Sequence, residues 1–301
     1  MIGDALARVG LALVRAVVRM PYPWVRALAS GLGALLYVVV VPRRRIALVN
    51  LGLCFPQWTE ARRRAVARAH FRLYARSFFD RFIVWEGSEQ RVREFVRLEH
   101  FERFEACRGR PLIVLVPHFL GLDAAGTRLS LQTRVASMYA DQSNRILNRA
   151  VRAGRARFND PVLLSRREGL RGAVRALRSG MPLYFLPDMD LGPRDAVFVP
   201  FFGVPAATVT SVARLARITG AVVLPLVARI ERDRYVAAFH PPWADCGTDP
   251  PEAVARRMNA FIEQRVLEMP AQYLWTHRRF KTRPPGEASP YAAIGATWFR
   301  R

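Results

Sequence analysis

The chain has 301 residues, of which 51% are hydrophobic, so it can bury one large core or two smaller ones and is not expected to be disordered. Its 47 lysine and arginine residues outnumber its 24 acidic residues, and the net charge of +23 favours anionic partners such as membrane lipids, phosphorylated substrates, an acidic carrier protein or nucleic acid. Three scattered cysteines, Cys54, Cys107 and Cys246, exclude a disulfide framework and a zinc site and are expected to be reduced.

The first 45 residues are expected to attach the protein to a membrane. Residues 5–20 interleave apolar side chains with Arg8, Arg15 and Arg19, which is typical of a basic amphipathic helix lying on anionic lipid. The stretch from Trp24 to Val41 is charged only at Arg26, and as a helix it would be about 27 Å long, just enough to cross a hydrocarbon core. The arginines that follow Pro42 would keep the C-terminal side in the cytoplasm. A membrane span, a surface-embedded helix and a buried core helix remain alternatives for this stretch.

Residues 60–86 have a helical pattern, and most of their aromatic side chains are expected to lie in the core. From residue 111 onward, short apolar runs alternate with segments of helical period. The runs cover residues 112–116, 134–139, 183–186 and 221–228, and residues 235–239 are expected to add an edge strand. This alternation predicts an α/β fold with a largely parallel central sheet flanked by helices.

Two helix ends can be placed from their sequence signals. Gly180 is expected to close one helix, and the run from Asp249 to Glu252 is expected to open another as a capping box. No linker divides the chain after residue 111. We therefore expect N-terminal membrane-associated helices over residues 1–45, a single α/β domain over 46–285 and a tail over 286–301.

The strongest candidate for chemistry is His118, at the end of the apolar run Pro111-Leu-Ile-Val-Leu-Val-Pro117. Asp123 follows five positions later. Within one helix the two side chains would be about 140° apart, so they can cooperate only if His118 lies in a loop and Asp123 begins the next helix. In that arrangement the carboxylate would hold the imidazole in one tautomer, as a general base for a hydroxyl group requires. A purely structural histidine is the alternative.

Two further polar clusters follow predicted strands, where a parallel sheet places its ligands. One is the run from Phe185 to Arg194, which contains Asp188 and Asp190, and the other is Ser165-Arg-Arg-Glu168. The aspartates lack partner ligands at metal-binding spacing, so no metal site is expected, and Asp188 is interpreted as a loop anchor that bonds to arginine. The arginines of the second cluster could bind phosphate at a helix start or be ordinary solvated charges.

Four blocks of the chain, taken in order, resemble the lipid A late acyltransferases. They are Asn50-Leu-Gly-Leu-Cys-Phe-Pro56, the H-x4-D block His118-Phe-Leu-Gly-Leu-Asp123, the middle segments 165–171, 186–192 and 198–208, and Gln272-Tyr-Leu-Trp-Thr-His-Arg-Arg-Phe-Lys-Thr-Arg283. Asp123 departs from the glutamate that is common in that family, whereas aspartate is typical of the wider glycerolipid acyltransferases. Leu186-Pro-Asp-Met189 stands in place of the Phe-Pro-Glu-Gly block of the glycerolipid enzymes, which favours the lipid A branch.

The resemblance implies transfer of an acyl chain from an acyl carrier protein thioester to a hydroxyl of a lipid A precursor at the cytoplasmic face of the bacterial inner membrane. No cofactor is implied. His118 would be the general base and Asp123 its orienting carboxylate, with direct transfer because no serine or cysteine lies beside the histidine. The expected substrate-binding residues are Arg167, Asp188, Arg194, His277, Arg278 and Arg279. Partners would be the carrier protein, the lipid A precursor and anionic membrane lipids, but not nucleic acid, because no nucleic-acid-binding module is recognisable.

Two alternatives remain open. The first is a phospholipid or other glycolipid acyltransferase of the same fold that uses acyl-CoA or acyl carrier protein. The second is a basic membrane-binding protein without enzymatic activity, for which loss of the His118 side chain would change nothing measurable. Acyl chain length and the acylated position are not specified by the sequence.

Overall fold

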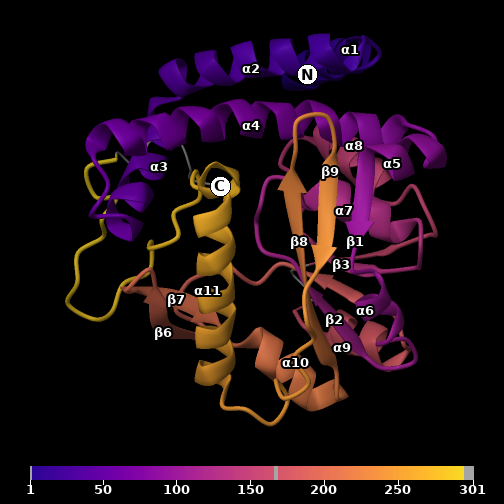
Figure 1. Ribbon diagram of the computed structural model, residues 1–301, viewed down its shortest axis with the longest axis vertical. Coiled ribbons are helices and arrows are strands. Elements are labelled where there is room, and N and C mark those ends of the chain that lie inside the picture. Colours follow the sequence, from indigo (N-terminus) through magenta and orange to yellow (C-terminus); the bar gives the residue numbers. More distant parts are fainter. Residues whose placement is uncertain (1, 166–168, 295–301) are drawn as a thin grey trace.

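A seven-stranded sheet runs through the middle of the molecule and carries helices on both faces (Figure 1). The structure is a computed structural model that describes residues 2–165 and 169–294. Its helices are α1 (Ile2–Val18), α2 (Tyr22–Val39), α3 (Val41–Cys54), α4 (Glu60–Glu86), α5 (Glu89–Phe95), α6 (Glu102–Glu105), α7 (Leu122–Ser130), α8 (Arg145–Arg155), α9 (Arg171–Arg178), α10 (Ser211–Thr219) and α11 (Pro251–Glu268), followed by a 3-10 turn, Pro270–Gln272. Its strands are β1 (Val96–Glu99), β2 (Leu112–Leu115), β3 (Ala136–Tyr139), β4 (Val162–Ser165), β5 (Leu183–Phe185), β6 (Ala196–Phe201), β7 (Val204–Val209), β8 (Val222–Ile230) and β9 (Tyr235–Phe239).

The sheet has the strand order β1-β9-β8-β2-β5-β3-β4. Every neighbouring pair is parallel except β8 and β9, which are antiparallel. The expectation of an α/β fold with a largely parallel sheet is therefore confirmed. The expectation that residues 235–239 form an edge strand was wrong, because β1 pairs with β9 on its outer side. β1 and β4 were not anticipated, since each is a four-residue strand with at most three consecutive apolar residues.

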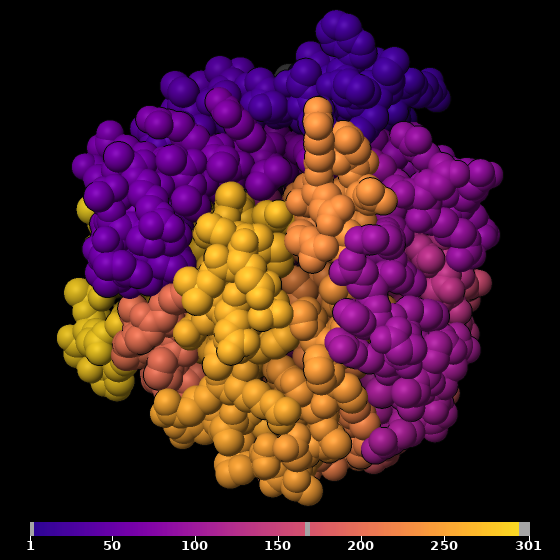
Figure 2. Space-filling model, in the orientation of Figure 1, coloured from indigo at the N-terminus to yellow at the C-terminus, as the bar shows by residue number. Residues whose placement is uncertain are grey.

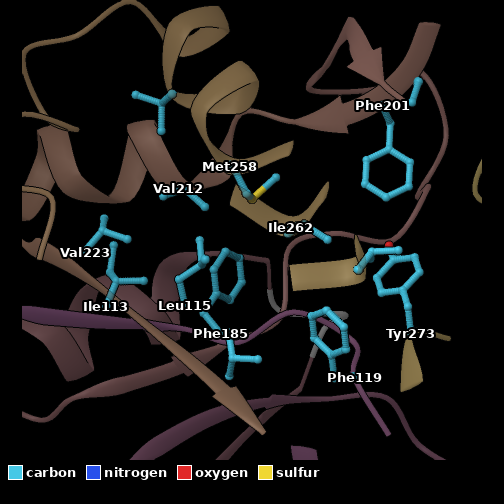
Figure 3. Packing of buried hydrophobic residues seen from close by; sticks show 14 of the residues in the cluster. Ile113, Leu115, Phe119, Phe185, Phe201, Val212, Val223, Met258, Ile262 and Tyr273 are labelled. Atoms are coloured by element: carbon cyan, nitrogen blue, oxygen red, sulfur yellow. The ribbon is translucent and has the colours of Figure 1, made fainter. Parts of the chain in front are cut away.

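Alternate residues of the central strand β2 face two separate hydrophobic clusters. Ile113 and Leu115 join helices α3, α9, α10 and α11 on one face, where Val212, Met258 and Ile262 pack over them (Figure 3). Leu112 and Val114 join α5, α6 and α7 on the other face. All four residues of β2 are buried, which explains why the strand is apolar throughout instead of alternating with polar side chains.

Helices α1 and α2 form an outer layer along one edge of the molecule, above the long helix α4 (Figures 1 and 2). α2 contacts α4 through Val25, Ala29 and Gly33, which recur every fourth residue and are buried. At Gly33 the two helices are so close that a Cβ atom would lie 2.4 Å from the Cα of Arg72. Tyr22 at the start of α2 also donates a hydrogen bond to the buried carboxylate of Asp80, at 3.1 Å. α2 is thus held along one side by the domain.

The opposite side of α2 is exposed and apolar. Trp24, Leu28, Leu35 and Val38 are 63, 47, 55 and 61% exposed, and α1 adds Leu6, Val9 and Leu13. Among the described residues, α2 is the one helix whose length and apolar composition would allow it to cross a membrane. The sequence placed the apolar stretch at residues 24–41, whereas α2 ends at Val39 and Val41 begins α3. An apolar outer surface on α1 and α2 fits the expected membrane association of these helices.

The long helix α4 begins at Thr59, whose side chain accepts a hydrogen bond from the Arg62 N–H. Its aromatic residues divide between two environments. Phe71, Phe79 and Phe82 are buried, as expected, but Tyr74 and Phe78 are 43 and 36% exposed. Tyr74 lines the cavity described below.

The two expectations about helix ends have different outcomes. Gly180 follows α9 with a φ of +77°, the left-handed conformation that closes a helix, as predicted. The capping box at Asp249 was wrong: Pro250 is the N-cap of α11 and no side chain caps it.

Tyr291 and Ile294, within the expected tail, are 3 and 6% exposed and belong to a core cluster. The packed chain therefore extends to the end of the described residues.

A separate hairpin, β6–β7, packs against α11. Its two-residue loop is formed by Phe202 and Gly203, which both have positive φ, at 51° and 77°. This is the geometry that the right-handed twist of a tight hairpin favours. The Phe202 N–H donates to the Glu263 carboxylate at 2.9 Å, which links the loop to α11.

Candidate active site

His118 lies in a loop just beyond β2, as the sequence predicted. Leu115 of β2 is directly opposite Phe185 of β5, and the Val116 N–H donates to the Phe185 carbonyl at 2.8 Å. His118 and Asp188 each lie three residues beyond this pair, past the ends of the two strands. Both residues therefore emerge together at the carboxyl ends of adjacent parallel strands, where sheets of this kind place their ligands.

Asp188 holds His118 at two atoms. One carboxylate oxygen lies 2.6 Å from the ring Nδ1, and the other accepts the backbone N–H of His118 at 2.9 Å. Burial alone would raise the pKa of Asp188, which is 1% exposed, but the His118 ring, its hydrogen bonds and the charge of Arg279 lower that pKa below its usual value. Because an ionised carboxylate only accepts hydrogen bonds, Nδ1 carries the proton. The lone pair of a neutral His118 ring is then on Nε2, the atom a general base uses.

Asp123 begins a helix as predicted, in the first turn of α7. The expectation that it hydrogen-bonds to His118 was wrong. Its carboxylate instead lies between two arginines, 2.8 Å from Nη2 of Arg155 and 2.9 Å from Nε of Arg81. Burial opposes ionisation of Asp123, but these two charges outweigh it and lower the pKa of the carboxyl, with a smaller contribution from His118. The loop between β2 and α7 turns Asp123 toward α4 and α8, so strand β5 provides the partner of the histidine.

A cavity of about 330 Å³ brings these groups together. His118, Asp123, Arg81 and Arg155 are polar members of its wall. Apolar side chains and polar loop residues complete the wall: Tyr74, Ser77, Phe119, Leu120, Leu122, Met138, Ala140, Gln142, Phe185, Leu186, Pro187, Met189, Leu191, Val209, Ser211 and Leu274. A mainly apolar cavity with a few convergent polar groups is typical of a small-molecule or lipid site.

A narrower crevice of about 40 Å³ continues from Asp123 beneath α7. It shares Leu122, Asp123, Arg155 and Leu186 with the cavity and ends among apolar residues that include Val135 and Leu163. Gly126 borders this crevice, where a Cβ atom would approach the Tyr184 ring to 3.3 Å. The hydroxyl of Tyr184 donates to the Leu122 carbonyl at 2.6 Å and so fixes the start of α7 beside Asp123.

The C-terminal segment crosses behind both loops of the site. The Leu274 N–H donates to the His118 carbonyl at 3.0 Å, and the Leu120 N–H donates to the Gln272 carbonyl at 2.9 Å. On the other loop, Asp190 accepts hydrogen bonds from the backbone and hydroxyl of Thr282, at 2.6 and 2.8 Å. Asp190 is therefore an anchor of the loop that carries Asp188.

His277 also belongs to this framework. Its Nε2 accepts the Asp190 N–H at 3.1 Å, and burial, together with the nearby charges of His118 and Arg279, lowers its pKa to about 3. A ring that is neutral and already used as an acceptor has a structural position, and His277 does not line the cavity. Its expected contact with a substrate phosphosugar is not supported by this placement.

The two arginines that follow His277 are likewise turned away from the cavity. Arg279 is 3% exposed and donates to the Ala207 carbonyl at 2.9 Å, to the Thr208 hydroxyl at 2.9 Å and to the Asn259 side chain at 3.2 Å. Arg278 lies over the Tyr291 ring. Neither lines the cavity, and their expected role in substrate binding stays a prediction. The guanidinium of Arg279 joins the β6–β7 hairpin to α11.

The expected substrate contacts of Arg194 and Arg167 stay predictions. Arg194 is exposed in the loop between β5 and β6 and does not line the cavity. Arg167 lies outside the described residues. Asp188 bonds to His118 and to no arginine in the described chain, so its interpretation as an arginine-bonded loop anchor was wrong.

Sequence reasoning missed Arg81 and Arg155. Each belongs to a helix with several exposed arginines, and the sequence gives no sign of which one turns inward. The nearest available signal was Asp123 itself, because a buried carboxylate without a histidine partner requires a cation.

Comparison with known proteins gives consistent matches over nearly the whole chain. Residues 2–282 match the sequence profile of the family described as bacterial lipid A biosynthesis acyltransferase. The lipid A biosynthesis lauroyltransferase of Escherichia coli is 34% identical over 292 residues, covering 95% of this chain and 94% of the relative. The palmitoleoyltransferase of the same organism is 32% identical, covering 94% of this chain and 93% of the relative, and its myristoyltransferase is 32% identical, covering 82 and 78%.

A solved structure is also similar, more distantly. The 1-acyl-sn-glycerophosphate acyltransferase of Thermotoga maritima aligns with a TM-score of 0.38 and 15% sequence identity, covering 76% of this chain and 97% of that one.

Proposed function

This chain belongs to the bacterial lipid A biosynthesis acyltransferase family, and from that membership we propose that it moves an acyl chain from acyl carrier protein to a hydroxyl of a lipid A precursor. The family assigns the general activity, an O-acyl transfer in lipid A biosynthesis. The donor, the direct mechanism and the site residues are our proposal. The observation that carries it is the contact of Asp188 with Nδ1 of His118 at the wall of a largely apolar cavity.

The reaction proceeds in one transfer without an acyl-enzyme. Nε2 of His118 takes the proton of the acceptor hydroxyl while the hydroxyl oxygen attacks the thioester carbonyl carbon. The carbon–sulfur bond then breaks, and the imidazolium returns its proton to the departing sulfur. The products are the ester and the free thiol of the carrier protein. Asp188 stays ionised throughout and stabilises the imidazolium, as the carboxylate of a catalytic triad does.

Asp123 is proposed to act through the arginines that surround it. Arg81 and Arg155 together carry two positive charges against the single negative charge of Asp123, so this wall of the cavity is cationic overall. Such a pair would hold an acceptor phosphate or the negative charge that develops on the thioester oxygen. Asp123 fixes the two guanidinium groups in place and would be a positioning residue.

The apolar surfaces suggest how a lipid reaches the site. Leu191 and Tyr74 line the cavity and are 49 and 43% exposed, so the cavity wall includes two largely apolar side chains that also face solvent. Tyr74 belongs to α4, and α4 packs against α2, whose other side is exposed and apolar. We propose that α1 and α2 lie in the cytoplasmic face of the inner membrane, where the acceptor resides. The crevice beneath α7 would receive the far end of the acyl chain.

Purified protein tests this function directly. Given lauroyl- or myristoyl-carrier protein and a tetra-acylated lipid A precursor, it should add one acyl chain, detected by mass spectrometry. A His118→Ala variant should lose about 10²–10⁴-fold in turnover, the usual contribution of a general base. Activity restricted to lysophospholipid with acyl-CoA would contradict the proposed substrates, and undiminished activity of the variant would contradict the proposed base.

A further inference from the structure

Helix α8 presents an exposed row of arginines that the proposed reaction does not use. Arg145, Arg149 and Arg152 lie within about 60° of one another around the helix, at 100° per residue. All three are exposed, and within the described chain Arg145 and Arg149 form no ion pair, while Arg152 lies 4.0 Å from Asp141. One turn beyond Arg152, Arg155 reaches inward to Asp123. The row is therefore on the same helix as a group of the candidate active site.

These arginines border a groove of about 590 Å³ beside the edge strand β4. The groove has small or apolar residues along it, Ala153, Ala156, Pro161 and Leu163. Pro161 and Leu163 also line the narrow crevice beneath α7. One basic side and an apolar floor suit an amphipathic acidic helix, whose carboxylates would pair with the guanidinium groups.

We propose that this groove, formed by α8 and residues 161–163, docks an acidic helix of the acyl carrier protein that donates the acyl chain. The inference rests on the proposed function, because it names the surface that receives the proposed donor. Charge complementarity argues for it: the chain carries +23 overall, and α8 contains four arginines and no acidic residue.

A lipid bilayer fits this groove less well. The large exposed apolar side chains that would enter a membrane are concentrated on α1 and α2, whereas α8 exposes one of them, Leu147. α8 contacts α1, and the amide of Asn144, the N-cap of α8, donates to the Gly3 carbonyl at 3.3 Å. The groove is thus placed beside the proposed membrane layer, where a soluble carrier protein could approach the site.

The test compares two charge reversals with the same helical spacing. Arg145→Glu/Arg149→Glu alters the groove, and Arg171→Glu/Arg175→Glu alters α9, which belongs to the core cluster on the opposite face of the sheet. Binding of holo-acyl carrier protein to the full chain is measured by surface plasmon resonance at low and moderate salt. The α8 variant should bind at least about tenfold more weakly, mainly through slower association, and should lose most of the salt dependence. The α9 variant should bind as the unaltered protein does.

Kinetics supply a second measurement. In the α8 variant, KM for the acylated carrier should rise at least about tenfold while kcat stays within about twofold. Unaltered circular dichroism and thermal midpoint show that both variants fold.

The outcomes separate the docking surface from the function on which it rests. If the unaltered protein neither binds carrier protein nor uses its thioester, the proposed donor is wrong. If it binds and the α8 reversal has no more effect than the α9 reversal, the groove is not the docking surface. If the α8 variant instead loses binding to phosphatidylethanolamine vesicles containing about a quarter phosphatidylglycerol, with carrier binding intact, the row contacts membrane and the proposal is overturned.

Discussion

Leu115 of β2 and Phe185 of β5 lie opposite each other in the sheet, and the loops that follow them bring His118 and Asp188 together. The contact therefore depends on the register of two strands that are separated by β3 and β4 in the chain. The connecting loop segments leave little conformational freedom, because His118 and Asp188 are each only three positions beyond the paired residue of their strand. The histidine and its carboxylate partner are positioned by the most buried part of the fold.

Replacing the Asp188 carboxylate by an amide should disable the base without unfolding the protein. Asp188→Asn keeps the shape of the side chain but removes the charge that stabilises the imidazolium and fixes the Nδ1 proton. We expect kcat/KM to fall about 10²–10⁴-fold. His118→Ala/Asp188→Asn should be no worse than His118→Ala alone, because the two residues act as a unit. A multiplicative loss in the double variant, or a loss below about tenfold in Asp188→Asn, would rule out the pairing as the catalytic unit.

Removing the carboxylate of Asp123 should destabilise the fold as well as impair transfer. Asp123→Ala leaves Arg81 and Arg155 half-buried without a counter-charge, which should cost about 3 kcal/mol of unfolding free energy. Adding Arg155→Met should recover part of that loss, and denaturant titration of both variants measures the recovery. Glu252→Ala is the matched control, because the exposed Glu252–Arg256 pair on α11 should contribute less than about 1 kcal/mol. Equal effects of Asp123→Ala and Glu252→Ala would contradict this account.

Gly33 should be essential for the attachment of α2 to α4. A side chain at this position meets the α4 backbone at Arg72, so Gly33→Leu should separate the two helices. Gly31→Leu is a close control, because a Cβ at Gly31 has no neighbour within 4 Å. Hydrogen exchange followed by mass spectrometry in detergent should show faster exchange over α2 only in the Gly33 variant. Equal exchange in both variants would show that the close contact does not hold α2.

Acid should destabilise the fold through its buried neutral histidines. Burial lowers the pKa of His277 to about 3 and that of His70 to about 4, from an ordinary value of 6.5. The unfolded chain therefore binds more protons than the native chain below pH 6.5, so the stability present above that pH is lost as pH falls toward the native values. Each histidine should contribute a slope of up to about 1.4 kcal/mol per pH unit.

Urea unfolding at several pH values between 7 and 5 measures this slope. His277→Gln keeps an acceptor for the Asp190 N–H but cannot bind the proton. The pH dependence of its unfolding free energy should therefore lack the contribution of one histidine, up to about 1.4 kcal/mol per pH unit. The lowered pKa values of Asp123 and Asp188 act in the same direction but at lower pH, near the ordinary carboxyl range. An unchanged slope in His277→Gln would show that His277 is not the responsible group.

The sequence predicted those features that depend on neighbouring residues. The position of His118 at a strand end and of Asp123 at a helix start follow from the apolar run, Pro117 and Gly121, and both were confirmed. The partner of His118 could not be predicted, because strand order is a property of the whole sheet. For the same reason the three buried acceptors of Arg279 could not be predicted, because they come from β7 and α11.

The C-terminal segment that crosses the site also determines when a newly made molecule can become active. Gln272 and Leu274 support the His118 loop, and Thr282 anchors the loop of Asp188 through Asp190. A ribosome adds these residues after all the strands whose loops they support. A nascent chain can therefore form its apolar helices and reach the membrane before either site loop is fixed. Catalytic competence should appear only after Thr282 has left the ribosome, so products truncated before that residue should not modify lipid.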